Sequence, residues 1–329
     1  MSKADDLRFL HRALALARNI SPRDVSPNPR VGCVLVKNGR VIAQAAHLRF
    51  AGPHAEPQAL AQAGRRARGA TAYVTMEPCS PFKGKKTPSC AVALARAGVS
   101  RVVCATLDPN PSVAGRGLRL LRRAGVKTER LPLRDEAESL NRAFFSLMRR
   151  RRPWVVMKTA LSLDGKAAAT SGRSRWVTGA KARAAVHAMR AGFDAILVGA
   201  GTVRADDPAL TAHGAGPDPL RVVLAGRKPL PRRARIFAGR SPALICRARG
   251  TAQLRALLHD LARRGVGTLL IEGGPTVHAA FLRAGLVDEA RVFLSPKLLS
   301  GTDDPNRAPR LKDTKIYRLG DDWLIKGVL

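Results

Sequence analysis

The first half of the chain is organised around His54-Ala55-Glu56, Glu77-Pro78-Cys79 and Thr87-Pro88-Ser89-Cys90. One imidazole and two thiols are ligands that zinc takes tetrahedrally, and a catalytic zinc site leaves the fourth position to water. The order H-x-E, then P-C and a later cysteine, is typical of zinc deaminases, in which the glutamate moves protons. We therefore predict that His54, Cys79 and Cys90 bind Zn2+ and that Glu56 is the catalytic proton shuttle.

Apolar periodicity around these motifs predicts that they lie at the ends of regular elements. His54 directly precedes a helical run, Cys79 follows a strand-like run over residues 72–75, and Cys90 opens a second helical run. Ligands at two helix starts beside one strand end can converge on a single ion. Ten residues separate the two cysteines, where nucleic-acid and cytidine deaminases have only about two.

Length and hydropathy indicate a globular protein of two domains. The chain has 329 residues, enough for two full cores, and its apolar fraction of 45% is ordinary. No apolar run approaches the roughly 20 residues needed to span a bilayer. The first residues lack the charged-then-apolar layout of a signal peptide. We expect a cytoplasmic protein with no membrane association.

The formal net charge of +34 is extreme and, taken alone, indicates nucleic-acid binding. However, the charge is spread along the whole chain, and aromatic residues make up only 4% of it, so platforms for base stacking are scarce. We expect phosphate-bearing small molecules as ligands and no nucleic acid. One alternative is a tRNA-type nucleic-acid deaminase with an accessory nucleotide-binding domain, which leaves residues 154–329 unexplained. A non-catalytic nucleotide- or RNA-binding protein is a second alternative, disfavoured by the intact His/Glu/Cys/Cys set.

Alternating strands and helices in the first half favour a three-layer α/β/α sheet. Asn38-Gly39, between two apolar runs, predicts a β-hairpin. Besides the runs at His54 and Cys90, helices are expected over residues 5–18, 117–124 and 136–148. The expected strands cover residues 31–36, 41–46, 72–75, 101–106 and 126–130.

A basic segment at residues 149–153 predicts the domain boundary, giving domains 1–150 and 151–329. The second half again alternates strands with helices. Strands are expected over residues 155–158, 195–198, 221–225, 243–246, 268–271 and 287–294 and in the tail 315–328. Helices are expected from residue 179 to 190, over 251–264, and from the turn at 273–276 to near 284.

Two glycine-containing turns follow apolar strands in the second half, at Gly199-Ala200-Gly201-Thr202 and Gly273-Gly274-Pro275-Thr276. Glycines let backbone amides approach a phosphate, and a helix N-terminus carries partial positive charge. Neither turn fits G-x-G-x-x-G followed by an acid about 20 residues later. Spacing alone leaves ordinary turns and dinucleotide binding equally favoured.

Taken together, the motifs of nearly the whole chain resemble those of the bifunctional deaminase/reductase family of riboflavin biosynthesis. The family's long loop between the cysteines matches the separation of Cys79 and Cys90, but Pro81 stands where the family has a histidine. The motifs that carry the resemblance are Pro27–Cys33, Pro53–Glu56, Glu77–Ser80, Asp108–Gly117, Ser162–Gly165, Ser171–Thr178, Gly201–Thr211 and Glu272–Thr276.

The resemblance implies a cytidine-deaminase-like α/β/α domain followed by a dihydrofolate-reductase-like α/β domain. It implies zinc-dependent deamination of 2,5-diamino-6-(5-phosphoribosylamino)pyrimidin-4(3H)-one, then reduction of the ribosyl group to ribityl with NADPH. It also implies a homo-oligomer held by the reductase domains.

Further site residues follow from matching positions in that family. For the deaminase they are substrate contacts at Asn28, His47 and Lys86. For the reductase they are substrate contacts at Ser174, Arg190, Leu210 and Glu272. The implied cofactor contacts are Ala160, Trp176, Thr202, Asp206, Gly274, Pro275, Thr276, Val277, His278, Ala279 and Ala280.

Overall fold

A computed structural model describes residues 2–82, 87–174, 176–238, 243–319 and 322–328. The chain divides into two compact units, residues 1–154 with 258–267, and residues 155–257 with 268–329. Within the described ranges, no helix combines the length and apolar character needed to cross a membrane.

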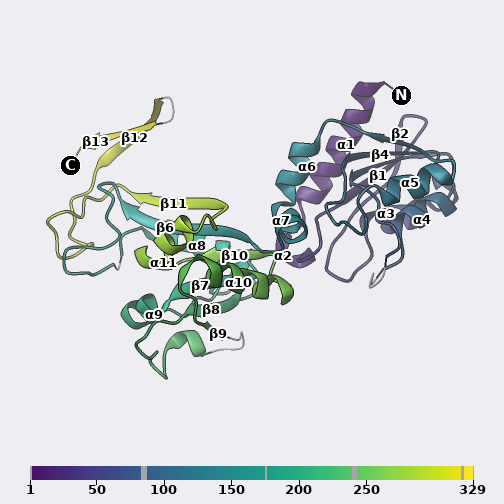
Figure 1. Ribbon diagram of the computed structural model, residues 1–329. Coiled ribbons are helices and arrows are strands. Elements are labelled where there is room, and N and C mark those ends of the chain that lie inside the picture. The colour runs from purple at the N-terminus through teal and green to yellow at the C-terminus, as the bar shows by residue number, and fades with distance from the viewer. Residues whose placement is uncertain (1, 83–86, 175, 239–242, 320–321, 329) are drawn as a thin grey trace. The chain divides into compact units, whose positions relative to one another are not determined.

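The first unit is built on a five-stranded sheet with the order β2-β1-β3-β4-β5 (Figure 1). Strand β1 is antiparallel to β2 and β3, whereas β3, β4 and β5 run parallel. The strands are β1 (Gly32–Lys37), β2 (Arg40–Ala46), β3 (Thr71–Met76), β4 (Arg101–Thr106) and β5 (Lys127–Arg130). Each predicted strand of this half is present.

The hairpin between β1 and β2 confirms the turn predicted from its sequence. Lys37 pairs with Arg40, so the loop consists of Asn38 and Gly39 alone. Both loop residues have positive φ, 50° and 73°. Those angles define a type I′ turn, which asparagine and glycine adopt most readily.

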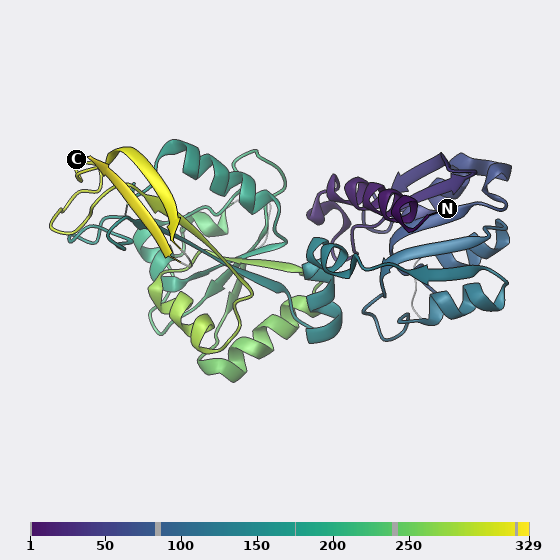
Figure 2. The same cartoon turned by 90° about the horizontal axis from the view of Figure 1, so that it is seen from above.

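Helices cover both faces of this sheet, which confirms the three-layer architecture (Figure 2). Helices α1 (Lys3–Arg18) and α6 (Arg134–Leu140) pack on one face, around a core that includes Leu10, Leu14 and Tyr73. The other face carries α3 (Ala55–Ala63), α4 (Cys90–Arg96) and α5 (Arg116–Arg123). The unit also contains α2 (Pro22–Val25), η1 (Gly64–Ala67) and α7 (Arg142–Arg150).

The single helix predicted over residues 136–148 is wrong, because the structure breaks it at Asn141 into α6 and α7. The Asn141 side chain accepts a hydrogen bond from the Arg30 N–H at 2.8 Å and donates one to the Arg30 carbonyl at 3.0 Å. This paired contact to a distant segment holds Asn141 at φ −118° and ψ 30°, outside the helical range.

The second unit contains a six-stranded sheet with the order β11-β6-β10-β7-β8-β9. The pairs β11–β6, β10–β7, β7–β8 and β8–β9 are parallel. Figure 2 shows α8 on one side of the sheet and α10 and α11 on the other. The strands are β6 (Trp154–Ser162), β7 (Ala195–Gly199), β8 (Leu220–Leu224), β9 (Ala243–Cys246), β10 (Thr268–Ile271) and β11 (Glu289–Ser295). The helices are α8 (Ala180–Ala191), α9 (Ala200–Asp206), η2 (Arg235–Phe237) and α11 (Pro275–Arg283), together with the first half of α10 (Gly250–Arg263), whose residues from 258 onward belong to the first unit.

Three elements of this unit differ from the prediction. Strand β6 is longer than expected, and the tail forms an antiparallel hairpin of β12 (Lys312–Leu319) and β13 (Asp322–Val328). The turn after β7 continues into helix α9, which ends where Asp207 adopts a left-handed φ of 39°. Helix α9 therefore carries Thr202 and Asp206 four residues apart, on one face.

Candidate functional sites

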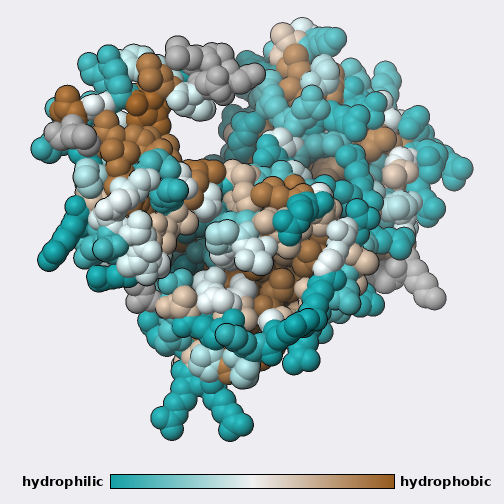
Figure 3. Space-filling view, turned by 60° about the vertical axis from the view of Figure 1, so that its left-hand side comes forward, coloured by the Kyte–Doolittle hydropathy of each residue, from teal (hydrophilic) through white to brown (hydrophobic). Residues whose placement is uncertain are grey.

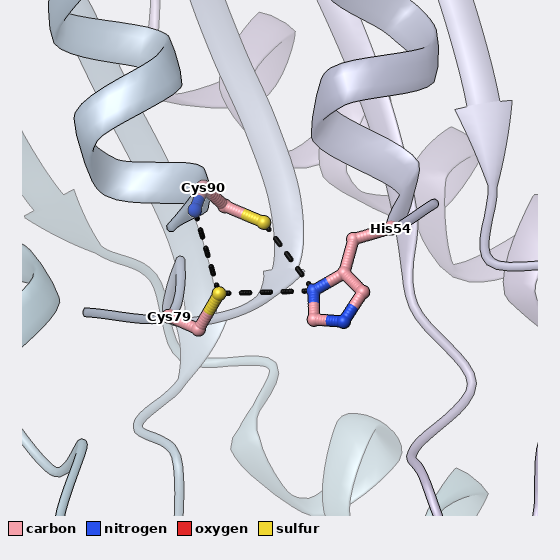
Figure 4. Close-up of side chains that lie close together, drawn as sticks. All are labelled: His54, Cys79 and Cys90. Atoms are coloured by element: carbon pink, nitrogen blue, oxygen red, sulfur yellow. Dashed lines mark hydrogen bonds between the residues drawn. The ribbon is translucent and has the colours of Figure 1, made fainter. Parts of the chain in front are cut away.

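The three predicted metal ligands converge at the end of β3 (Figure 4). The His54 Nδ1 atom lies 3.7 Å from Cys79 Sγ and 3.3 Å from Cys90 Sγ. All three donor atoms lie within 4.8 Å of one another, close enough to share one ion. Hydrogen bonding to Cys79 and burial raise the pKa of the Cys90 thiol. A bound cation would offset this by stabilising the thiolate, so the donor set fits zinc.

Helix starts hold these ligands in place. His54 is the residue before α3, and Cys90 is the first residue of α4. Ser89 caps α4 by accepting a hydrogen bond from the Val92 N–H, and its hydroxyl donates to the Cys79 carbonyl at 2.8 Å. One serine therefore fixes the segments that carry both cysteines.

The second nitrogen of the His54 ring faces a hydroxyl. Nε2 lies 3.2 Å from Thr87 Oγ1, whereas Nδ1 faces the two sulfur atoms. If Nδ1 is the metal donor, Nε2 carries the proton and donates to the threonine. Such a hydrogen bond fixes the tautomer and orientation of a metal-binding histidine.

Glu56 lies beside the cluster with one oxygen unused. Its side chain is 3% exposed, and Oε2 has no hydrogen-bond partner within the described residues. Burial, followed by the nearby Cys79, raises the pKa of the carboxyl. His54, Glu56 and Cys79 line one cavity of about 360 Å³. A buried carboxyl with a free oxygen in a cavity can exchange protons with a bound molecule.

The predicted deaminase substrate contacts have three different outcomes. Asn28 lines the cavity, and His47 is buried behind it. His47 Nδ1 donates to the Pro53 carbonyl at 3.1 Å, which leaves Nε2 to accept from Asn28 Nδ2 at 3.4 Å. Burial lowers the pKa of His47 and favours this neutral form. His47 therefore orients the Asn28 side chain. The third predicted contact, Lys86, lies outside the described residues.

Two residues that were not predicted as site residues also line this cavity, Asp108 and Asn110. Burial raises the pKa of Asp108 to about 7, against the opposing effect of a hydrogen bond from the Asn110 N–H. In the sequence, both residues belong to the Asp-Pro-Asn-Pro motif. That motif predicts a loop but does not indicate where its side chains point.

Hydrogen bonds to Glu77 hold the segment at the start of α5 beside the cavity. The buried Glu77 carboxylate accepts hydrogen bonds from the Gly115 N–H at 2.8 Å and the Leu118 N–H at 3.2 Å. The close approach requires glycine at position 117, where a Cβ atom would lie 1.9 Å from the Pro78 carbonyl oxygen. The Glu-Pro-Cys motif therefore links the predicted ligand Cys79 to the segment at the start of α5.

The second unit holds a larger cavity, of about 920 Å³, where β7 and β10 end. It brings together eight predicted reductase residues, Ser174, Thr202, Asp206, Glu272, Gly274, Pro275, Thr276 and Val277. Arg204, Arg227 and Arg249 add positive charge to its wall. The volume and the charge suit an elongated anionic ligand.

Both glycine turns are required by the way α11 packs here. A Cβ atom at Gly199 would lie 2.8 Å from the Val277 side chain, and one at Gly273 would lie 2.7 Å from it. The two turns therefore approach closely, and the N-terminus of α11 opens on the cavity with Gly274 as its cap. Backbone N–H groups at such a helix start can bind phosphate, so the site fits a phosphate-bearing cofactor.

Buried charges adjoin this cavity. Arg190 makes two hydrogen bonds to the Glu272 carboxylate, at 2.8 and 3.0 Å, and Lys158 lies 3.6 Å from it. Burial alone would raise the pKa of Glu272, but Arg190 and Lys158 outweigh it and lower the pKa. Ser174 donates to Asp206 at 3.2 Å. These pairs fix the side chains of Glu272, Ser174 and Asp206 at the wall of the cavity.

Seven predicted reductase residues do not line this cavity, and the roles of all fifteen predicted reductase residues stay predictions. Arg190 reaches it through Glu272. Trp176 lines a different cavity, with the Arg183 guanidinium 4.4 Å above its ring. Burial lowers the pKa of His278, whose Nε2 has no hydrogen-bond partner in the described part of the chain. The remaining four are Ala160, Leu210, Ala279 and Ala280.

These features define a class of protein. A helix-covered sheet that presents a His/Cys/Cys cluster beside a buried glutamate is the architecture of a zinc-dependent deaminase. The sequence profile of the cytidine and deoxycytidylate deaminase zinc-binding region matches residues 3–106, and that of the RibD C-terminal domain matches residues 153–325. The chain belongs to the RibD family.

Relatives match along nearly the whole chain. The riboflavin biosynthesis protein RibD of Haemophilus influenzae is 37% identical over 97% of this chain and 94% of its own length. RibD of Escherichia coli is 38% identical over 96% of this chain and 97% of its own length. The solved structure of Acinetobacter baumannii RibD has a TM-score of 0.82 at 35% identity and covers 99% of both chains. A Thermotoga maritima structure described as a diaminohydroxyphosphoribosylaminopyrimidine deaminase/5-amino-6-(5-phosphoribosylamino)uracil reductase has a TM-score of 0.81 at 33% identity. It covers 98% of this chain and 97% of its own.

Proposed function

We propose that this chain catalyses two consecutive steps of riboflavin biosynthesis. The first is hydrolytic deamination of 2,5-diamino-6-(5-phosphoribosylamino)pyrimidin-4(3H)-one, and the second is reduction of the ribosyl group to ribityl with NADPH. One observation carries the proposal: the His54/Cys79/Cys90 cluster lies beside a buried Glu56, in a chain whose second half matches the RibD C-terminal domain. We assign residues 1–150 to deamination and residues 151–329 to reduction.

In the deaminase, His54, Cys79 and Cys90 would hold the zinc ion. Bound zinc supplies Lewis acidity, which makes water a competent nucleophile at neutral pH. The free oxygen of Glu56 accepts a proton from the attacking water and passes it to the departing amine. Asn28, oriented by His47, offers its amide to the pyrimidine ring.

In the reductase, the chain binds and orients NADPH, which supplies the hydride. The glycine turns and the start of α11 would hold phosphate groups, and the arginines on the cavity wall add attraction. Ser174 and the Arg190–Glu272 pair would hold the ribosyl end of the substrate. Thr202 and Asp206, on the same face of α9, would contact the cofactor.

The tRNA-type alternative is not favoured, because the relatives that match the whole chain are RibD proteins. A nucleic-acid deaminase would leave the RibD C-terminal domain at residues 153–325 without a role. The absence of a nucleic-acid partner and the cytoplasmic location both stay predictions.

A coupled assay tests the proposed function. The protein is given the diaminopyrimidine nucleotide with NADPH, and ammonia release and NADPH absorbance are followed together. We expect ammonia to appear first and NADPH oxidation to follow, with no ammonia from tRNA or single-stranded DNA. Ammonia from a polynucleotide but not from the nucleotide would contradict the proposal.

We propose further that the reductase unit holds the chain in a homo-oligomer. Strand β11 is an edge strand, and its Val292 and Leu294 are exposed. The β12–β13 hairpin exposes Ile316 and Trp323, and Figure 3 shows apolar side chains gathered on it. An exposed apolar edge favours pairing with a second copy, since it would otherwise promote aggregation.

Replacing Trp323 by glutamate tests this interface. Trp323 is 65% exposed, so the unit should still fold, while a charge on the apolar surface should dissociate the oligomer. Sedimentation should show the mass falling from a multiple of the monomer to the monomer. Ile245→Glu is the matched control, because Ile245 is 53% exposed on β9 at the other edge of the same sheet. Equal dissociation by both variants, or none by Trp323→Glu, would contradict the proposed interface.

A further inference from the structure

A third cavity, of about 350 Å³, lies on the first unit at the start of the loop between the two cysteines. Its lining residues are Ser80, Pro81, Arg116, Arg119, Leu120 and Arg123. None of them lines the cavity that contains Glu56 and Cys79. Neither the deaminase nor the reductase chemistry proposed above uses this cavity.

One helix, α5, contributes three arginine side chains to the lining of this cavity. Arg116, Arg119 and Arg123 follow one another at helical spacings of three and four residues, so they share a face of α5. Helix α5 contains no acidic residue, and within the described ranges these three side chains form no ion pair. Like charges at these spacings repel each other, so an anion in the cavity would stabilise the helix.

The arginine-rich composition of the chain could by itself place arginines on a helix, but Ser80 distinguishes this face. Ser80 is 3% exposed, and its hydroxyl oxygen has no hydrogen-bond partner among the described residues. A buried hydroxyl is normally hydrogen-bonded, because leaving one unpaired is unfavourable. An oxygen atom of a bound anion would supply the missing partner.

We propose that this cavity is a binding site for a small oligophosphate, an anion that carries two or more linked phosphate groups. Guanidinium groups bind phosphate through paired hydrogen bonds, which makes arginine well suited to this ligand. Arg116 and Arg123 are seven residues apart, about 10 Å along the helix axis, which exceeds the reach of a single phosphate. The two reactions proposed above do not require this site.

A ligand bound at this site could affect the deaminase site, because the two sites are adjacent in the sequence. Ser80 directly follows Cys79, and Cys79 contributes a sulfur atom to the metal-binding cluster. A ligand held between Ser80 and α5 would restrain the start of the loop between the two cysteines. Occupancy should therefore change the deamination rate without blocking the substrate cavity.

Calorimetric titration of the zinc-loaded full chain with tripolyphosphate tests the site at physiological salt. We expect saturable binding that is at least tenfold weaker in R119E/R123E and several-fold weaker in Ser80→Ala. R122E is the matched control, since Arg122 is on the same helix but does not line the cavity. It should bind within about twofold of the parent, and inorganic phosphate should bind far more weakly than tripolyphosphate.

Several results would overturn the proposal. Equal weakening by R122E would indicate a general effect of surface charge. Binding only of single-stranded RNA, lost in R119E/R123E, would replace the small ligand with a polynucleotide. A tenfold rise of KM for the diaminopyrimidine nucleotide in R119E/R123E would assign the arginines to the substrate site. Absence of tripolyphosphate binding to the parent protein would remove the site altogether.

Discussion

Glu56→Gln is expected to reduce ammonia release by roughly 10²- to 10⁴-fold, the usual contribution of a general acid–base group. Glutamine has nearly the same size as glutamate, so the buried position should tolerate it. The amide cannot accept and return a proton, which is the role assigned to the unpartnered Oε2. Zinc content should stay at one ion per chain, because the three donor atoms of the cluster are unchanged.

The same variant should leave the reductase intact. NADPH oxidation with the already deaminated intermediate should match that of the parent protein, since every described residue that lines the reductase cavity belongs to the second half. Asp206→Ala is the reciprocal control and should lose NADPH oxidation while retaining ammonia release. If either substitution silenced both reactions in a folded protein, the assignment of two separate sites would be wrong.

The metal cluster could be predicted from the sequence because its signals are local. His54 and Cys90 lie at helix starts, and Cys79 follows β3. One imidazole and two thiols form a donor set that is typical of zinc. The hairpin at Asn38-Gly39 was predictable for a similar reason, since the dipeptide itself favours the required positive φ angles.

Features that depend on tertiary contacts could not be predicted in this way. The break at Asn141 results from hydrogen bonds to Arg30, more than a hundred residues away in the sequence. Asp108 and Asn110 enter the deaminase cavity because Glu77 holds the following loop, which no periodicity reveals. The cofactor contact predicted for Trp176 rests on the family resemblance alone. The structure places Trp176 and Asp206 at different cavities.

Glu272→Gln is expected to destabilise the reductase unit by about 3–5 kcal/mol, the usual effect of removing one partner from a buried ion pair. The Arg190 and Glu272 side chains are only 12% and 7% exposed, so the remaining guanidinium would stay largely dehydrated beside a neutral amide. Reduction of the deaminated intermediate should slow by roughly 10- to 100-fold, which corresponds to one charge-assisted hydrogen bond.

Thermal unfolding of the full chain measures the expected loss of stability. The transition that NADPH shifts upward belongs to the reductase unit, because a ligand stabilises only the unit that binds it. Glu289→Gln is the matched control in the same unit. Glu289 pairs with Arg291 at 2.7 Å on a more exposed surface, where such pairs contribute only about 0–1 kcal/mol. Equal effects of the two substitutions would contradict a special role for the buried pair.

The difference in unfolding free energy between the parent protein and Glu272→Gln should depend on pH, which provides an independent check. The pKa of Glu272 is lowered in the folded protein, because the charges of Arg190 and Lys158 outweigh the effect of burial. Its ionisation therefore stabilises the fold fully above the pKa of an unfolded glutamate, about 4.3, and this contribution is lost as the pH falls through the lower folded value. The stability gap between the parent and Glu272→Gln should be constant near neutral pH and should narrow below about pH 4. A gap that widened on acidification would mean that the Glu272 carboxyl is held protonated in the fold and that the ion pair with Arg190 does not form.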